Sequence, residues 1–305
     1  MSTTDLSTTK FDVYRAVTDR IVQAIEAGAK DFVMPWHSHG APLRRPLNAA
    51  TGFPYGGISQ IVLWAEAQVS RFGPRNWATL RQWQRLGASV RKCERPTPTV
   101  YYTTLHAGDP DARLENDERG PPMVARATWV FNARQVEGWA PRRASGSDRT
   151  VTCAGPLESA EAFVAAAEAD VPFGPEFPGC WPSEDVIEMP DRSLHVGPSG
   201  RSPTEVHYAT LLYETVRRTV ARHRANNGFG ERFGGDADAM EALVTELGAA
   251  FLCSALSVAN VPRPGHAAHV ASWLKFLKGD HRAIFSIARY ASSAVECLTK
   301  PSASP

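Results

Sequence analysis

The sequence of 305 residues shows neither a secretory signal nor a membrane span of about 20 apolar residues, and it begins with the polar run MSTTDLSTTK. We therefore expect a cytoplasmic protein with no membrane partner. The five cysteines are scattered without a Cys-x-x-Cys pair, which fits neither a disulfide framework nor a structural zinc cluster. No segment repeats another. What the chain does contain is ordinary for about two soluble globular domains, with 43% hydrophobic and 21% charged residues.

Charge is almost balanced overall, at +1, but it is unevenly distributed. Residues 40–105 hold nine Lys or Arg against two acids, a charge of +7, together with eight aromatic residues. Basic groups between aromatic rings suit a sequence-tolerant binder of single strands, because phosphates attract the cations and bases stack on the rings. The alternative is a solvated basic face above a core of tryptophans, which is the commoner use of such residues.

Hydrophobic periodicity predicts an α+β protein. In the first half we expect helices over 11–27, 58–71 and 77–86, an irregular Pro- and Gly-rich loop over 31–57, and a hairpin of strands 97–105 and 124–132. The tip of that hairpin, 107–122, is acidic. In the second half we expect helices near 159–169, over 205–225, from 236 or 238, over 267–277 and over 281–299, with a strand pair within 186–196. The polar stretch 141–155 is the expected linker between domains over 8–140 and 156–300.

Short motifs in a fixed order resemble a known family. In the first half they are Thr51-Gly52, Tyr55, Gly57-Ile58, Trp64, Trp77, Gly87, Val90-Arg91-Lys92, Val130-Phe131-Asn132 and Gln135 to Gly138. In the second half they are His207 to Leu212, Glu241, Glu246 to Leu252, Ala271 to Lys275 and Arg282 to Phe285. Together, over about residues 11–298, they resemble the ArdC-type antirestriction proteins.

The resemblance implies an N-terminal mixed helix and β-hairpin domain that binds single-stranded DNA. It also implies that this domain is followed by a mostly helical zincin-like metallopeptidase domain, which contains a small sheet. The implied function is protection of incoming plasmid or mobile-element DNA from host restriction, for example during conjugation. In this family the metallopeptidase motif binds zinc or a similar divalent ion.

The chain departs from the family at this motif. His-Glu-x-x-His places two zinc ligands on one helix face with the glutamate as general base, but here the run is Tyr213-Glu214-Thr215-Val216-Arg217. Tyrosine is a poor zinc ligand and arginine is none. We therefore expect no metal, no cofactor and no catalytic residue, so that an enzymatic activity is doubtful; if the chain is active, Glu214 is the catalytic residue.

A relocated metal site is the alternative. Its ligands would come from Glu241 or Glu246, which spacing does not distinguish, and from His266 and His269, which share an i, i+3 spacing. His207 and His223 cannot share an ion, because 16 helical residues separate them by about 24 Å. In the metal-free reading, Glu214 needs a partner for its buried carboxylate, and we predict a structural contact with Arg217.

For the single-stranded DNA itself we expect contacts from cations and from aromatic rings of the basic segment. The predicted phosphate contacts are Arg44, Arg45, Arg91 and Lys92, and the predicted stacking residues are Tyr55, Trp77 and Tyr102. Arg81 is also expected to bind the DNA. Trp64, in the apolar run 58–67, is expected in the core.

The sequence is compatible with three functions. The first is a non-enzymatic, single-stranded DNA-binding antirestriction protein, and the second is a metallopeptidase with relocated ligands. The third is a non-catalytic protein that docks onto a host restriction or defence enzyme, with the acidic tip at 109–118 competing for a basic surface.

Overall fold

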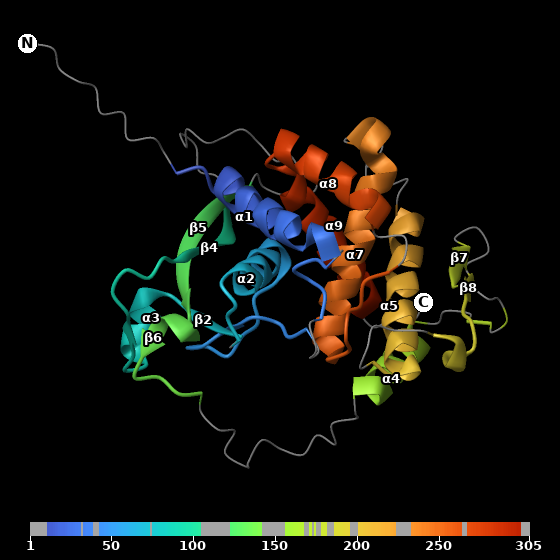
Figure 1. Cartoon of the computed structure of the whole chain (residues 1–305), viewed down its shortest axis with the longest axis horizontal. Coiled ribbons are helices and arrows are strands. Elements are labelled where there is room, and N and C mark those ends of the chain that lie inside the picture. Colours follow the sequence, from blue (N-terminus) through green and yellow to red (C-terminus); the bar gives the residue numbers. More distant parts are fainter. Residues whose placement is uncertain are drawn as a thin grey trace, which may run out of the picture.

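The computed structural model describes residues 11–31, 33–38, 43–73, 75–104, 123–141, 156–167, 171–172, 174, 178–181, 186–195, 201–223, 233–263 and 267–299. It is the predicted α+β fold, with a curled sheet in the N-terminal half and a mostly helical C-terminal half (Figure 1). The predicted acidic tip and the predicted linker, apart from Pro141, lie outside the described residues.

The sheet of the N-terminal half has four strands in the order β1-β2-β5-β4. Their bounds are Leu47–Asn48, Asn76–Ala78, Met123–Asn132 and Thr97–Thr104. Strands β4 and β5 pair antiparallel from Thr97 opposite Val130 to Thr104 opposite Met123, which confirms the predicted pairing. Strand β2 was not predicted, since three residues carry too little alternation to be recognised.

Two helices cover this sheet and separate it from the C-terminal half (Figure 1). Helix α1, Val13–Gly28, begins where the Asp12 side chain accepts a hydrogen bond from the Arg15 amide. Helix α2, Gly57–Val69, packs against both α1 and β4. The short helix α3, Leu80–Arg85, carries a capping box between Thr79 and Gln82. It lies beside a two-stranded sheet of β3, Ser89–Val90, and β6, Val136–Glu137.

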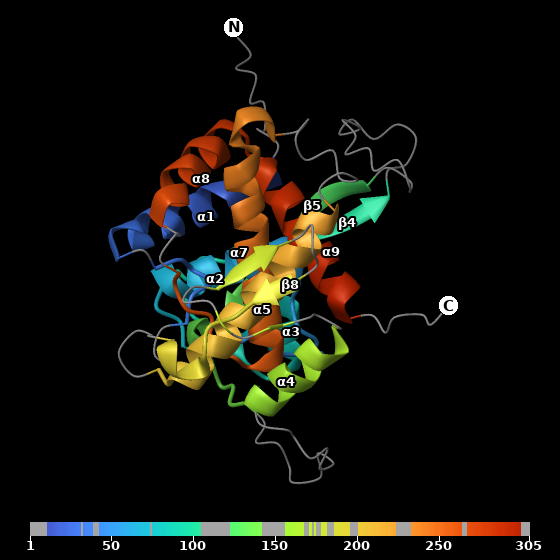
Figure 2. The ribbon, with the colours of Figure 1, turned by 90° about the vertical axis from the view of Figure 1, so that its right-hand side faces the viewer.

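The C-terminal half is built around helix α7, Ala237–Leu256, which packs against both α5, Pro203–His223, and α9, Ala283–Thr299 (Figure 2). Its apolar length would suffice for a membrane span, but 72% of that window is buried inside the fold, as in the central helix of a globular core. A Cβ at Gly248 would come within 2.7 Å of Val216 Cγ1, so glycine allows α5 and α7 to approach closely.

The remaining elements of this half surround those three helices. Helix α4 spans Pro156–Ala166 and α8 spans Ala267–Gly279. The small sheet pairs β7, Gly179–Trp181, with β8, Val186–Glu188. The predicted strand pair within 186–196 is therefore wrong in its second member, because 192–194 forms a 3₁₀ turn instead. Further 3₁₀ turns lie at Ala29–Asp31, Ala133–Gln135 and Gly234–Asp236.

The two halves share one apolar core rather than packing as separate bodies. Residues of α1 and α2 belong to the same buried cluster as residues of α5, α7, α8 and α9. Helix α1 contacts α8, and α2 contacts α9. A site at this junction is thus held by both halves of the chain.

Candidate nucleic-acid groove and degenerate metal site

The run 213–217 lies on α5, with residues 214–216 buried and Arg217 at the surface. Glu214 is buried, and Arg217 Nη1 donates to its Oε2 over 3.4 Å, which confirms the predicted contact. Burial raises the pKa of Glu214, and the charges of Arg217 and then Arg263 lower it part of the way back. The carboxylate is therefore partnered by a guanidinium from its own helix turn.

A second carboxylate, Glu246 of α7, lies at the same place and is buried with 2% of its surface exposed. Its Oε2 accepts a hydrogen bond from Arg263 Nη1 over 3.1 Å, and its Oε1 lies 3.0 Å from His37 Nε2. The charges of Glu246 and Arg263 both act on the pKa of Tyr213, the first raising it and the second lowering it. Glu246 therefore lies beside the motif.

The guanidinium of Arg263 covers the ring of Tyr213, with its Cζ 4.0 Å from the ring centroid. Burial, followed by the charge of Glu246, raises the pKa of Tyr213 to about 12, so the phenol is neutral. A neutral phenol and two arginines do not make a divalent-metal site, and the side chains around Glu246 do not fit the family's zinc.

Other donors do not complete such a site. Cys253 is close enough to sense Arg263 and Glu246, but burial raises the pKa of its thiol to about 12. Of the relocated candidates, His266 lies outside the described residues and His269 stacks on Trp273. Among the residues that the structure describes, no three His, Cys, Asp or Glu side chains gather as a metal would require.

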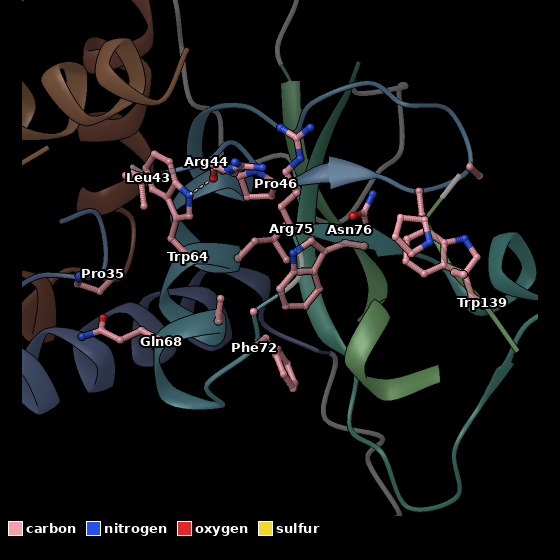
Figure 3. A pocket seen from close by; sticks show the side chains of 18 of the residues that line it. Pro35, Leu43, Arg44, Pro46, Trp64, Gln68, Phe72, Arg75, Asn76 and Trp139 are labelled. Carbon is pink, nitrogen blue, oxygen red and sulfur yellow. Dashed lines mark hydrogen bonds between the residues drawn. The ribbon is translucent and has the colours of Figure 1, made fainter. Parts of the chain in front are cut away.

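A large groove of about 1220 Å³ opens on the N-terminal half and reaches the loop that carries His37 (Figure 3). Three arginines line it, Arg44, Arg75 and Arg85. Figure 3 shows Arg44 and Arg75 between Pro35 and Gln68 at one end and Trp139 at the other. Trp64 forms part of the floor, where its Nε1 donates to the Arg44 carbonyl over 3.0 Å.

The charges in this groove are not balanced locally. Arg44, Arg75 and Arg85 have no carboxylate partner within 4.0 Å among the described residues, whereas Arg15, Arg20 and Arg91 of the same half each pair with an acid. Burial, and then the charge of Arg44, lower the pKa of Arg75. An anion that binds between two neighbouring positive charges reduces the repulsion between them.

The predicted DNA-contacting cations lie in different places in the structure, some at the groove and others away from it. Arg44 lines the groove, and Arg45 is half-buried beside it with a pKa lowered by burial. Arg91 pairs with Glu94 over 2.6 Å, so part of its charge is already neutralised. Arg81, on α3, and Lys92, in the turn after β3, are exposed away from the groove lining.

The predicted stacking residues need correction. Trp77 borders the groove but is 1% exposed and packs edge-on against Phe72, so its faces are not available to a base. Tyr55 packs on the core, and its Oη accepts from Asn48 Nδ2 over 3.2 Å. Tyr102 is 40% exposed on β4, outside the groove lining. Trp64 is 5% exposed and belongs to the core, as expected.

Several residues of the site were missed by the sequence analysis. Trp139 follows the last strand of the N-terminal half, and its ring packs edge-on against Trp83 at 5.2 Å. His37 and Arg263 lie in loops without periodicity. A lone histidine and a lone arginine gave no signal there, because their partner Glu246 is 209 residues from His37.

Comparison with known proteins identifies the two halves. Residues 11–131 match the family of the N-terminal domain of anti-restriction factor ArdC, and residues 158–290 match a family described as zincin-like metallopeptidase. The fold and the site thus define a zincin-like scaffold attached to an ArdC-type N-terminal domain.

Individual relatives agree with this class. The antirestriction ArdC protein from R388 plasmid, solved metal-free, is 30% identical with a TM-score of 0.69 over 94% of this chain and 97% of its own. Its Mn(II)-bound structure is 31% identical, also with a TM-score of 0.69, over 96% of this chain and 99% of its own. The chain belongs to the ArdC family of antirestriction proteins, as the motifs indicated.

Two curated relatives extend the comparison. Protein y4eC of Sinorhizobium fredii (strain NBRC 101917 / NGR234), described as uncharacterized, is 36% identical over 98% of this chain and 95% of its own length. DNA primase TraC of Escherichia coli is 31% identical over 90% of this chain. The chain spans 26% of the length of that primase.

Proposed function

We propose that this chain is an antirestriction protein of a plasmid or other mobile element that binds single-stranded DNA in the groove of its N-terminal half. Its zincin-like domain acts as a scaffold without a metal ion and without peptidase activity. The observation that carries the proposal is the groove lined by three arginines without a local carboxylate partner among the described residues.

The charge of the groove favours a polyanion. Phosphates supply most of the affinity in sequence-tolerant nucleic-acid binding. Arg44 and Arg75 are close enough that the charge of one lowers the pKa of the other. A bound phosphate between them removes this repulsion and adds charge-assisted hydrogen bonds.

The size and lining of the groove favour an extended ligand. Its volume of about 1220 Å³ exceeds the range of about 300–1,000 Å³ that is usual for small-molecule pockets. Trp139, half-buried at one end, is the aromatic residue we assign to base stacking, in place of Trp77 and Tyr55.

The side chains around Glu246 support the absence of a metal. Tyr213 and Arg217 stand where the family motif has histidines, and both buried carboxylates have guanidinium partners. The Mn(II)-bound R388 relative sets the contrast, because it shows that a member of the family holds a metal. Glu214 has no catalytic role under this proposal.

The relatives supply the biological setting. The R388 protein is plasmid-borne and antirestrictive, and TraC is a DNA primase. We assign this chain to the cytoplasm, with single-stranded DNA as its partner and protection of transferred DNA as its task. A host restriction or defence enzyme is its second proposed partner.

Fluorescence anisotropy with a labelled single-stranded oligonucleotide tests the binding claim. Arg44→Gln/Arg75→Gln should lower the affinity at least tenfold at 0.1 M salt. The control Arg15→Gln/Lys30→Gln removes the same charge from exposed positions on α1 and in the 3₁₀ turn after it, and should change the affinity less than twofold. Equal losses in the two variants would show that net charge, rather than the groove, governs binding. An unlabelled duplex should compete less well than an unlabelled single strand.

The alternative of a metallopeptidase is tested separately. The chain should release no peptide from a denatured protein substrate in the presence of Mn²⁺ or Zn²⁺. Metal-dependent cleavage that disappears in Glu214→Gln would establish the alternative, whatever the DNA-binding result.

A further inference from the structure

Both oxygens of Glu246 are already occupied. The Met34 amide donates to His37 Nδ1 over 3.0 Å, so that nitrogen carries no proton and the ring proton is on Nε2. His37 Nε2 therefore donates to Glu246 Oε1, and Arg263 Nη1 donates to Oε2. A metal ion at this carboxylate would have to displace one of the two donors.

Arg263 is held on several sides, and its side chain is 13% exposed. Its Nη2 donates to the Ala209 carbonyl of α5 over 3.0 Å and to Asn260 Oδ1 over 3.3 Å. Its guanidinium covers the ring of Tyr213 at 4.0 Å, a cation–π arrangement at the position of the first motif histidine. The guanidinium thus lies between α5 and α7, in contact with both the residue at the first motif position and Glu246.

The charges of this cluster also balance. Glu214 and Glu246 contribute two negative charges, and Arg217 and Arg263 contribute two positive charges. A divalent ion between the same two carboxylates would give the same net charge of zero. Buried carboxylates are costly without such compensation, and here arginines from α5 and from the loop after α7 provide it.

We propose that the guanidinium of Arg263 is a resident cation that occupies the metal position of the zincin scaffold and bridges α5 and α7 there. This rests on the metal-free state in the proposed function, and it identifies what has replaced the metal. The pocket is then closed to divalent ions by Arg263 itself, as well as by the loss of the two histidines.

The bridge also reaches the N-terminal half. Asn260, which accepts from Arg263, donates from Nδ2 to the Trp36 carbonyl over 2.9 Å, and its backbone amide donates to Ser38 Oγ. Ser38 returns a hydrogen bond from its amide to the Asn260 carbonyl. Loop 33–38 is therefore fixed to the C-terminal half twice, through Glu246 and through Asn260.

Restoring the histidines tests whether Arg263 occupies the metal position. Zinc binding is measured by calorimetry for Tyr213→His/Arg217→His and for the same variant with Arg263→Ala added, each checked for folding by circular dichroism. The triple variant should bind one zinc per chain at least tenfold more tightly than the double variant. Equal affinities, or no zinc binding by a folded triple variant, would overturn the proposal.

A thermal double-mutant cycle gives a second readout that does not depend on metal. Arg263→Met and Glu246→Gln should each lower the Tm by about 6 °C or more, because each leaves a buried partner unsatisfied. The double variant should fall by clearly less than the sum of the two. Additive losses would show that Arg263 does not act through Glu246.

The wild-type chain separates this inference from the proposed function. One zinc or manganese bound per wild-type chain, and lost in Glu246→Gln, would contradict both. A wild-type chain without metal, combined with equal zinc affinities of the double and triple variants, would contradict only the role of Arg263.

Discussion

The groove and the pocket around Glu246 use arginine in opposite ways. In the groove, Arg44, Arg75 and Arg85 lie toward solvent without a carboxylate partner among the described residues. Around Glu246, guanidiniums and carboxylates alternate and their charges cancel. The contrast indicates that the first set is kept for a ligand and the second set stabilises the fold. Under the proposed function, the groove binds the ligand, while arginine side chains of the fold take the place of the family's metal.

Breaking the buried network should have the largest effect. Glu246→Gln leaves Arg263 buried without its anion, and we expect the free energy of unfolding to fall by about 3–5 kcal/mol. Urea denaturation monitored by tryptophan fluorescence measures it. A loss below about 1 kcal/mol would mean that the pocket is solvated enough to resemble a surface ion pair.

A buried histidine pair between α5 and the 3₁₀ turn at 192–194 provides the next test of charge burial. His207 Nδ1 lies 3.1 Å from His195 Nε2, and burial, followed by the charges of His195 and Arg192, lowers the pKa of His207 to about 4, while Asp191 opposes the shift. The unfolded chain takes up this proton near pH 6.5, so stability falls as the pH drops from 6.5 toward 4. Between pH 7 and pH 5 the loss from His207 alone is about 2 kcal/mol.

The variant His207→Gln should remove this part of the pH dependence, whereas His269→Gln should keep it. Chemical denaturation of both variants and the wild type at pH 7 and pH 5 gives the comparison. Identical pH dependence in all three would show that His207 is not neutral in the folded chain.

Salt should act on the groove and leave the pocket unchanged. Each phosphate contact in single-stranded DNA contributes a slope of about −0.7 to log affinity against log salt, so three arginines predict an affinity about 20-fold weaker at 200 mM than at 50 mM salt. With Arg44→Gln/Arg75→Gln the same change should weaken binding only about threefold. An affinity of the wild type that does not depend on salt would contradict the electrostatic assignment.

Glu214→Gln should have the smallest effect, although Glu214 is the acid that a peptidase would need. Burial already raises its pKa, so stability falls as the pH rises from the unfolded value through the folded value, and removing the charge removes this loss. At pH 7 we expect the free energy of unfolding to change by less than about 1 kcal/mol. A loss as large as that of Glu246→Gln would show that the two carboxylates are equally essential to the network.

Long amphipathic helices could be predicted from the sequence, because their apolar stripes are buried in the fold. The predicted helices over 11–27 and 58–71 correspond to α1 and α2, and those of the second half correspond to α4, α5, α7, α8 and α9 within a few residues. Strands of two or three residues were missed or misplaced, since their pairing depends on neighbours elsewhere in the chain. The shared core of the two halves could not be predicted from the sequence either. Hydrophobic periodicity shows that one face of a helix is buried, but it does not show which other element packs against that face.

The candidate site was predicted in part for the same reason. The contact between Glu214 and Arg217 was foreseen because it spans one helical turn. Trp77 was assigned to stacking because composition cannot tell a buried ring from an exposed one. Arg263 and His37 meet Glu246 only through tertiary folding, and a single cation in a loop carries no local signal.

The most direct test measures DNA affinity and thermal stability in parallel on Arg44→Gln/Arg75→Gln and Arg263→Met. The first variant should lose at least tenfold in affinity for single-stranded DNA with a Tm within about 2 °C of wild type. The second should lose about 6 °C or more in Tm and, well below that Tm, keep its affinity within about twofold, because the bonds of Asn260 to Trp36 and Ser38 still hold loop 33–38. An Arg263→Met chain that loses DNA binding while keeping its stability, or a groove variant that keeps full affinity, would contradict the division between a binding set and a structural set of arginines.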